Sequence, residues 1–232
     1  MAITVYWASL EREWMLAKEP ESVAKLFYEK DMHDTNNLNA QLNYCPSFNK
    51  NLKNLYALRS LYDYSFKVEG DKVWSPDRDQ DFFDMHVNIR DVNRRLFSFK
   101  QCFLFFTEED SLPVTFYEYP YLEDNNITER CMIVAGQFDI GKWFRNTEFA
   151  FYLKKDYNEF KIEQDEVFTY LRFHTDEKIN FKQFRPTQRI SELIADGFAC
   201  NQIWQPLRKL ENYYKIFKNK RLALKEIKEN LL

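Results

Sequence analysis

Aromatic residues at every second position are the feature that most constrains how this chain folds. Between residues 62 and 181 Phe and Tyr recur with a period of two, for example at Tyr62, Tyr64 and Phe66 and again at Phe149 and Phe151. Successive side chains of a β-strand point to opposite faces, so this pattern predicts strands with one face in a core. The 232 residues include 22 Phe and 14 Tyr, which is enough to fill a large core.

The expected strands are short and lie about ten residues apart. Glu69-Gly70-Asp71 supplies a turn between two of them, and Glu163-Gln164-Asp165 supplies another. Strands do not alternate with helices here, so we expect antiparallel pairing and no parallel sheet. The runs are Thr4–Trp7, Tyr62–Val68, Lys72–Trp74, Phe97–Phe106, Val114–Tyr121, Cys131–Val134, Phe149–Leu153, Phe160–Ile162, Val167–Phe173 and Ile179–Phe181.

Helical patterns occur near both ends of the chain. Pro20 is expected to open one helix, and Ser47 to cap a second that continues to about Arg59. A third follows Pro186, and a long one runs from Pro206 to the end.

The long C-terminal helix has an apolar residue every seven positions. These residues are Leu210, Phe217, Leu224 and Leu231, and the companion heptad position changes from Leu207 and Tyr214 to Arg221 and Lys228. We therefore expect the first half to dock on the protein body, and the second half to be half solvated or paired with another chain.

Together these patterns predict an α+β protein. Its centre is an antiparallel β-rich, jelly-roll-like sandwich or barrel, with helices near the N-terminus and a long C-terminal helix. We expect residues 1–185 to form one mixed domain and residues 186–232 a helical extension packed on it.

Composition excludes several classes of protein. Only 4 Gly are present and no GxGxxG or GxxxxGK[ST] occurs, which excludes those two kinds of nucleotide site. No apolar run is long enough to span a bilayer, and the first residues do not form a signal peptide. The four widely spaced Cys include no CxxC pair and indicate reduced thiols in an intracellular protein.

Charge is distributed unevenly. Residues 208–232 hold eight Lys or Arg and three Glu, a net charge of +5, whereas the whole chain carries −3. A basic end on an acidic body favours a protein partner or self-association through the C-terminal helix. The acidic total disfavours nucleic acid as the partner.

Histidine and aspartate provide one candidate metal site. His174 and Asp176 form an HxD triplet, the pattern that gives two ligands of a 2-His-1-carboxylate iron site, and His86 is the candidate third ligand. No histidine follows His174, so an ordinary strand-end histidine is the favoured interpretation. An acidic run (Asp77, Asp79, Asp81, Asp84) lacks the Gly and Glu of a calcium loop, and we interpret it as solvated.

The segment 136–145 holds two of the four glycines next to Trp143 and Arg145. Arg145 beside an indole could bind a carboxylate or phosphate, with Arg172 on a nearby strand. The competing interpretation, an ion pair within the protein, is favoured.

About 60% of the chain resembles a family of functionally uncharacterised proteins encoded by tailed phages of marine cyanobacteria. Three segments carry the resemblance: Cys45-Pro46-Ser47-Phe48 with Asn54-Leu55-Tyr56, residues 136–145, and Val167–Phe173 ahead of Thr175-Asp176-Glu177. The resemblance implies a viral product acting in the host cytoplasm or in the virion, and it carries no catalytic residues across.

Two functions therefore stay open. The first is a phage accessory or virion-associated protein that acts through protein–protein contacts. The alternative is a jelly-roll-like enzyme or small-ligand-binding protein, with or without a divalent metal, whose site lies near His86, Arg145, Arg172 and His174.

Overall fold

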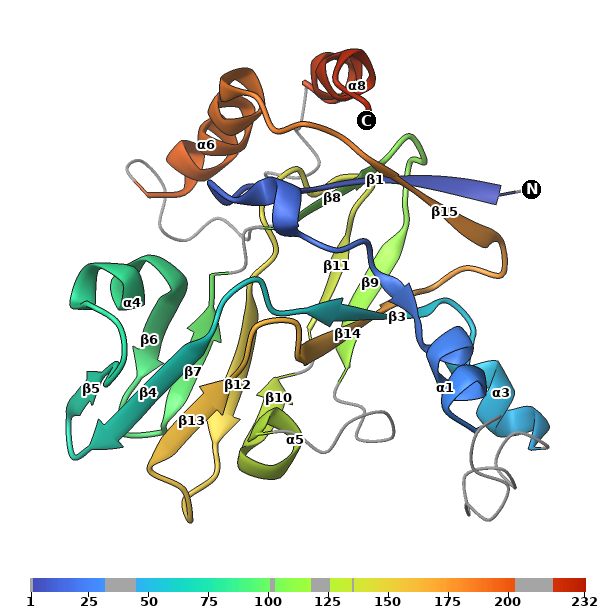
Figure 1. Cartoon of the computed structure of the whole chain (residues 1–232). Coiled ribbons are helices and arrows are strands. Elements are labelled where there is room, and N and C mark those ends of the chain that lie inside the picture. Colours follow the sequence, from blue (N-terminus) through green and yellow to red (C-terminus); the bar gives the residue numbers. More distant parts are fainter. Residues whose placement is uncertain (1, 32–44, 101–102, 118–125, 135, 203–218) are drawn as a thin grey trace.

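The computed structural model describes residues 2–31, 45–100, 103–117, 126–134, 136–202 and 219–232. Within them the chain forms four β-sheets with helices at their periphery (Figure 1). This confirms the α+β class and the antiparallel character of most strand pairs. The jelly-roll arrangement stays a prediction, because none of the described sheets closes on itself.

We name the sheets by their composition. The N-terminal sheet has the order β15 (Lys178–Gln183), β1 (Ala2–Ser9), β8 (Phe103–Thr107). The five-stranded sheet has the order β11 (Gln137–Asp139), β9 (Pro113–Tyr117), β14 (Val167–Phe173), β3 (Leu55–Arg59), β2 (Glu21–Ser22). The four-stranded sheet has the order β10 (Cys131–Val134), β12 (Phe149–Leu153), β7 (Leu96–Phe99), β6 (Val87–Asp91). The hairpin sheet has the order β13 (Glu159–Ile162), β4 (Tyr64–Glu69), β5 (Lys72–Trp74).

Aromatic side chains from all four sheets meet in one main core. Its largest fully buried members include Trp7, Phe66, Phe97, Phe151 and Phe173. These residues occupy alternate positions of their strands, so the period of two in the sequence corresponds to the inward faces. The aromatic pattern is thus the physical cause of a core shared among sheets.

One strand pair differs from the expectation. β1 and β15 run parallel, with Ala2 opposite Lys178 and Trp7 opposite Gln183. β1 is therefore central in its sheet, and both of its faces are covered: Trp7 points into the main core while Tyr6 and Ala8 pack against helices. The expectation of no parallel pairing was wrong, because the two partners come from opposite ends of the chain and no local pattern reports their direction.

Two expected elements are divided differently. The stretch expected as one strand, Phe97–Phe106, forms β7 and β8 in separate sheets, although both supply Phe rings to the main core. The helix expected to run to Arg59 ends earlier, as α3 (Pro46–Leu52), and β3 follows. Asn54 makes this change of direction at φ 53°, and its side-chain amide donates to the carbonyls of Thr175 and Glu177.

The other helices and short turns lie at the edges of the sheets. They are η1 (Trp14–Leu16), α1 (Val23–Asp31), α4 (Gln80–His86), α5 (Asn126–Arg130), α6 (Gln188–Gln202) and α8 (Lys220–Glu229). α1 and α3 cover β3 and β14 through Val23, Phe27 and Leu52. α6 and α8 cover the N-terminal sheet (Figure 1).

The C-terminal end of the chain packs on the body. Ala223 and Ile227 of α8 are fully buried with Phe106, Phe144 and Phe184, a group that we call the helix-side core. The expectation of a half-solvated second half agrees with this arrangement, because Ala223 and Ile227 are buried whereas Leu222 is 50% exposed. Burial follows Ala223 and Ile227, four residues apart, instead of the seven-residue spacing of Leu224 and Leu231. Residues 206–218 of the expected helix lie outside the described residues.

Three connections between sheets converge at one place. Residues 60–63 lead from the five-stranded sheet to the hairpin sheet, and residues 163–166 lead back. The Ser60 N–H donates to the Glu166 carbonyl (2.8 Å) and the Asp165 N–H to the Ser60 carbonyl (2.9 Å). The connection that begins at Lys100 passes from the four-stranded to the N-terminal sheet. This convergence forms the walls of a pocket.

Candidate functional site

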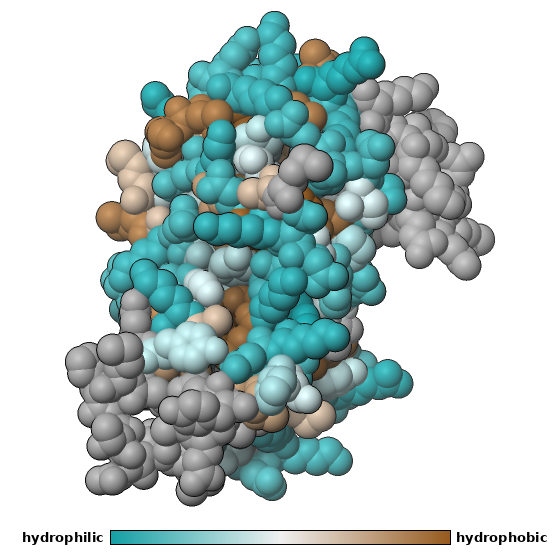
Figure 2. All heavy atoms as spheres, turned by 90° about the vertical axis from the view of Figure 1, so that its right-hand side faces the viewer, coloured by the Kyte–Doolittle hydropathy of each residue, from teal (hydrophilic) through white to brown (hydrophobic). Residues whose placement is uncertain are grey.

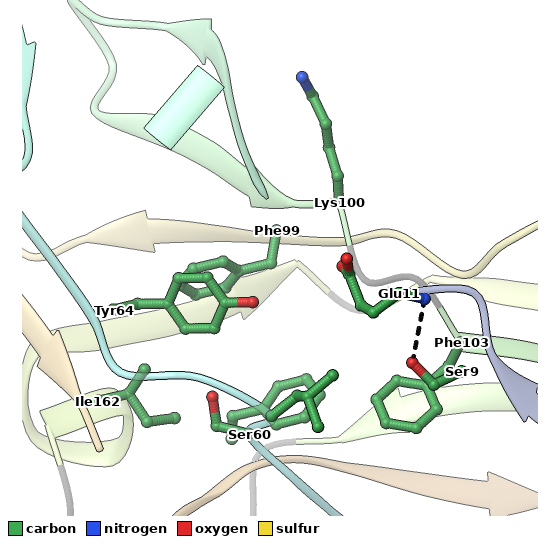
Figure 3. A pocket seen from close by; sticks show the side chains of 10 residues that line it. Ser9, Glu11, Ser60, Tyr64, Phe99, Lys100, Phe103 and Ile162 are labelled. Atoms are coloured by element: carbon green, nitrogen blue, oxygen red, sulfur yellow. Dashed lines mark hydrogen bonds between the residues drawn. The ribbon is translucent and has the colours of Figure 1, made fainter. Parts of the chain in front are cut away.

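The pocket lies where strands leave one sheet for another. The hollow measures about 390 Å³ when the open solvent at its mouth is counted, and only a small part of this space is enclosed. Each of the four sheets contributes to its wall, and most of that wall is apolar (Figure 3). The lining residues are Ser9, Glu11, Ser60, Leu61, Tyr64, Phe99, Lys100, Phe103, Ile162 and Phe168.

Two hydroxyl groups, those of Tyr64 and Ser60, point into this apolar space (Figure 3). The Glu11 carboxylate lies at its rim, close to Lys100 (Figure 3). Ser60 donates its proton to the Tyr62 carbonyl at 2.7 Å, so its oxygen remains an acceptor toward the pocket. Lys100 lines the mouth, but its side chain extends away from the pocket and its ammonium donates to the Asp84 carbonyl.

Glu11 is held by His86. The Glu11 Oε1 atom lies 3.3 Å from His86 Nε2, and both side chains are largely buried. His86 is the last residue of α4, a helix whose first turn is capped by Asp79 through the Phe82 N–H. The α4 helix thus carries the imidazole to the mouth of the pocket.

Both imidazole nitrogens of His86 face oxygen acceptors. Nδ1 lies 2.8 Å from the Phe82 carbonyl, and Nε2 faces Glu11. Only the doubly protonated ring can donate to both, because a neutral imidazole has a single N–H. Burial by itself lowers the pKa of His86, but the hydrogen bonds to Glu11 and Phe82 outweigh it and raise the pKa above its ordinary value.

This arrangement decides which group can exchange protons with a ligand. A general base needs a nitrogen or oxygen directed at the ligand. Both nitrogens of His86 are directed at protein oxygens, whereas the Glu11 carboxylate lies at the rim of the pocket. Glu11 is therefore the side chain that can accept a hydrogen bond or proton there, and His86 positions it.

The predicted metal ligands are not brought together. His174 follows β14, and its Nε2 is 2.7 Å from Thr115 Oγ1 on β9. Burial, followed by the nearby charge of Arg172, lowers the pKa of His174, which favours the neutral ring. Asp176 is exposed and pairs with Lys53 at 2.9 Å. His86 is held instead by Glu11, and no group of three His, Cys, Asp or Glu side chains suited to a metal occurs in the described residues.

The second predicted site contains a cation–π contact. The Arg145 guanidinium lies over the Trp143 ring, 5.0 Å from its centroid, and Arg172 lies half-buried on β14. The segment around them is organised by Asp139, whose carboxylate accepts from Ser111, Lys142 and the N–H groups of Leu112 and Gly141. Burial alone raises the pKa of Asp139, but these hydrogen bonds lower it overall.

The acidic run has ordinary structural contacts. Asp77 accepts from Ser65 at 2.6 Å, Asp79 caps α4, and Asp84 accepts from Gln80. These contacts agree with the interpretation as a solvated acidic connection, with the addition that part of it is helical.

Sequence reasoning singled out His86 but missed the pocket. Glu11 is distant in sequence from Ser60 and Tyr64, and the three residues match no local motif. The one available signal was a polar break: Ser9 and Glu11 follow the strand residues Val5 and Trp7 at alternate positions, where an apolar run would continue. Such a break does not identify its partners.

The fold and site define an α+β protein with an apolar pocket and a carboxylate at its mouth. Comparison of the chain with protein-family models, with curated proteins and with solved structures finds no match. The resemblance to cyanobacterial phage proteins stays an expectation from the quoted segments. None of the described helices has the length and apolar character needed to cross a membrane.

Proposed function

We propose that this protein binds a small, mainly apolar molecule that carries one hydrogen-bond donor. The observation that carries this proposal is the pocket between the four sheets, with apolar walls, two inward hydroxyl groups and a carboxylate at its rim. Ligand sites are commonly apolar cavities with a few convergent polar groups, and a residue of shifted pKa beside one strengthens the inference.

Hydrogen-bond accounting favours a donor on the ligand. An ionised Glu11 carboxylate only accepts, and the Ser60 hydroxyl has already donated to Tyr62. A ligand amine or hydroxyl could donate to these oxygens in addition to their present partners, whereas a ligand carboxylate would be repelled by Glu11. The surrounding rings of Phe99, Phe103 and Phe168 would contact the apolar part.

Four small molecules of matched shape test this. Benzyl alcohol, benzylamine, toluene and benzoate would be titrated into isotope-labelled protein, with amide chemical shifts followed by NMR. We expect benzyl alcohol or benzylamine to bind most tightly and to shift the amides of residues 9–11, 60–64 and 99–100. Absence of such shifts with all four compounds would refute the proposal.

A matched pair of variants locates the binding. Glu11→Gln should weaken binding of benzylamine about tenfold, because a charge-assisted hydrogen bond is lost. Glu13→Gln is the control, since Glu13 lies on the same connection but accepts from the Tyr62 hydroxyl. Equal weakening in both variants would show that the connection as a whole, and not the Glu11 carboxylate, supports binding.

A phage accessory function through protein contacts is the second candidate. What supports it, besides the resemblance, is apolar exposure at the C-terminal end: Leu222 is 50% exposed and Leu232 is 70% exposed. On the face shown in Figure 2, hydrophobic residues form only small separate areas among hydrophilic ones. We take a second copy of the chain as the occupant of the outer side of α8, because its buried side is already packed.

Light scattering distinguishes this second candidate. Self-association through α8 predicts a mass above that of one chain, reduced to one chain in Leu222→Glu. Met85→Glu, an exposed apolar position on α4, is the control and should leave the mass unchanged. A wild-type protein with the mass of a single chain would refute self-association.

A further inference from the structure

We infer that residues 10–19 form a strap over the pocket and that protonation of His86 holds this strap closed. The inference depends on the proposed function only for the use of the pocket. It concerns the connection between β1 and β2, which contains η1 and contributes Glu11 to the pocket mouth (Figure 3).

Polar tethers fix the strap to the body. Glu11 pairs with His86 at 3.3 Å, Glu13 accepts from the Tyr62 hydroxyl, and Lys18 pairs with Asp165 at 3.0 Å. The tip between them is weakly buried, since Met15 is 74% exposed and Leu16 60%. Leu10 and Ala17, near the two ends of the strap, pack against the cores, whereas the exposed tip depends on the tethers and opens at lower energetic cost.

The Glu11–His86 tether is the buried one. The Lys18–Asp165 pair is about half exposed on both sides, and exposed pairs contribute little. The His86 and Glu11 side chains are 7% and 17% exposed, so their contact is shielded from water. Breaking it would release Glu11 from the pocket mouth.

The groups around His86 explain why its charge matters. Glu11 faces it from the strap, and Lys100, whose backbone N–H donates to the His86 carbonyl, adds a positive charge from the end of β7. Asp84 of α4 bonds Gln80, and the Tyr62, Tyr64 and Phe82 rings surround the imidazole. Glu11 thus supplies the opposing charge that favours the imidazolium.

The direction of the switch follows from the raised pKa of His86. Below that pKa the imidazolium donates to both Phe82 and Glu11, so the strap is closed. As pH rises through it, the ring keeps one N–H, the ion pair is lost, and the strap opens. Alkaline conditions should therefore expose the pocket.

Limited digestion with trypsin measures the opening. Arg12 and Lys18 are exposed cleavage positions within the strap, and Lys155, in the exposed turn between β12 and β13, is an internal reference. The quantity is the ratio of cleavage at 12 and 18 to cleavage at 155, followed by mass spectrometry. The ratio removes the effect of pH on trypsin itself.

We expect the ratio to rise about fivefold or more between pH 6 and pH 9 in the wild-type protein. This corresponds to a decrease of about 1 kcal/mol in the free energy of strap opening. In His86→Gln the side-chain amide can donate to Glu11 at both pH values, so the ratio should stay low and flat. In Glu11→Gln the ratio should already be raised at pH 6 and should change little between pH 6 and pH 9. In Tyr62→Phe, which removes the Glu13 tether, the ratio should be higher than in the wild-type protein at both pH values. It should still increase between pH 6 and pH 9 by the same factor.

A wild-type ratio that does not change with pH would overturn the inference. Circular dichroism would confirm that each variant is folded, and the Tyr62→Phe comparison keeps the test informative if His86→Gln is unstable. If the cleavage ratio changes with pH but none of the four small molecules binds, the strap inference is supported and the proposed function is refuted. If they bind and the ratio does not change with pH, only the strap inference is refuted.

Discussion

Gly141 occupies a position where a side chain does not fit. A Cβ atom there would lie 2.6 Å from the Glu109 carbonyl oxygen, which belongs to the backbone and cannot swing aside. The same two backbone segments receive the Lys220 ammonium, which donates to the carbonyls of Glu109 and Gly141. The glycine therefore permits a close backbone contact that also anchors the start of α8.

Gly141→Ala should lower the free energy of unfolding by about 1–3 kcal/mol, because the backbone must move apart. Gly136→Ala is the matched control, since nothing lies within 4 Å of its added Cβ. Urea unfolding followed by circular dichroism gives both values. Equal effects in the two variants would contradict the steric explanation.

The buried imidazolium of His86 makes stability pH-dependent. Its folded-state pKa is raised, so its stabilising contribution is complete below the ordinary pKa of histidine and is lost as pH rises through the folded-state pKa. Relative to His86→Gln, the wild-type protein should lose about 1.5 kcal/mol of unfolding free energy across this range, the contribution of a hydrogen bond to a charged group. Urea titrations at pH 5.5, 7 and 9 would show it. A constant difference between the two proteins would contradict the pairing of His86 with Glu11.

At the scale of elements, α8 is part of the body. Lys228 pairs with Glu108 at 2.8 Å, and Glu108 also accepts from the Tyr6 hydroxyl of β1. The chain then returns to β15, where the Leu232 N–H donates to the Gln183 carbonyl. The basic charge that indicated an external partner is used in part within the molecule, at Lys220 and Lys228.

Two aliphatic residues on α8 differ in burial, because Ile227 is buried and Leu222 is half exposed. Ile227→Ala should destabilise the protein by about 2–4 kcal/mol through a cavity in the helix-side core. Leu222→Ala, at a half-exposed position, should change stability by less than about 0.5 kcal/mol. Thermal unfolding of the two variants is the measurement. Similar losses would mean that α8 is not docked as described.

At the scale of the whole molecule, the sheets share one core. The main core joins strands from all four sheets, and β1 links the first residues of the chain to β15 near its end. Such a structure gains most of its contacts only when distant segments meet, so partial folding leaves large apolar surfaces exposed.

We therefore expect the protein to unfold in one transition. Far-ultraviolet circular dichroism, which follows all strands and helices, and tryptophan fluorescence, which includes buried Trp7, should give the same urea midpoint. An earlier transition that is lost when α6 and α8 are removed would instead show that residues 186–232 unfold as a separate unit.

Local sequence patterns predicted much of the fold. The hairpin of β4 and β5, with Gly70 at φ 57° between them, and the strands β10, β12, β13 and β14 match the expected runs closely. The helix after Pro186 is also confirmed as α6. These succeeded because a strand or helix that buries one face has a characteristic period, whatever its partners are.

Of the candidate site, the sequence pointed to only one residue. His86 was singled out as a possible ligand, but its partner Glu11 lies 75 positions earlier and appears in no motif with it. His174 and Asp176, separated only by Thr175, have different partners, Thr115 and Lys53. Proximity in sequence was therefore a poor guide to proximity in space.

By itself the sequence determined an aromatic β-core, its turns and the helical ends, because periodicity and turn residues act over a few neighbouring positions. Only the tertiary structure decided that β1 and β15 run parallel, that α8 buries Ala223 and Ile227, and that Glu11 meets His86 at a pocket mouth. Each of these depends on which distant segments pair. That choice is made by the complementarity of whole faces, which no short stretch of the chain contains.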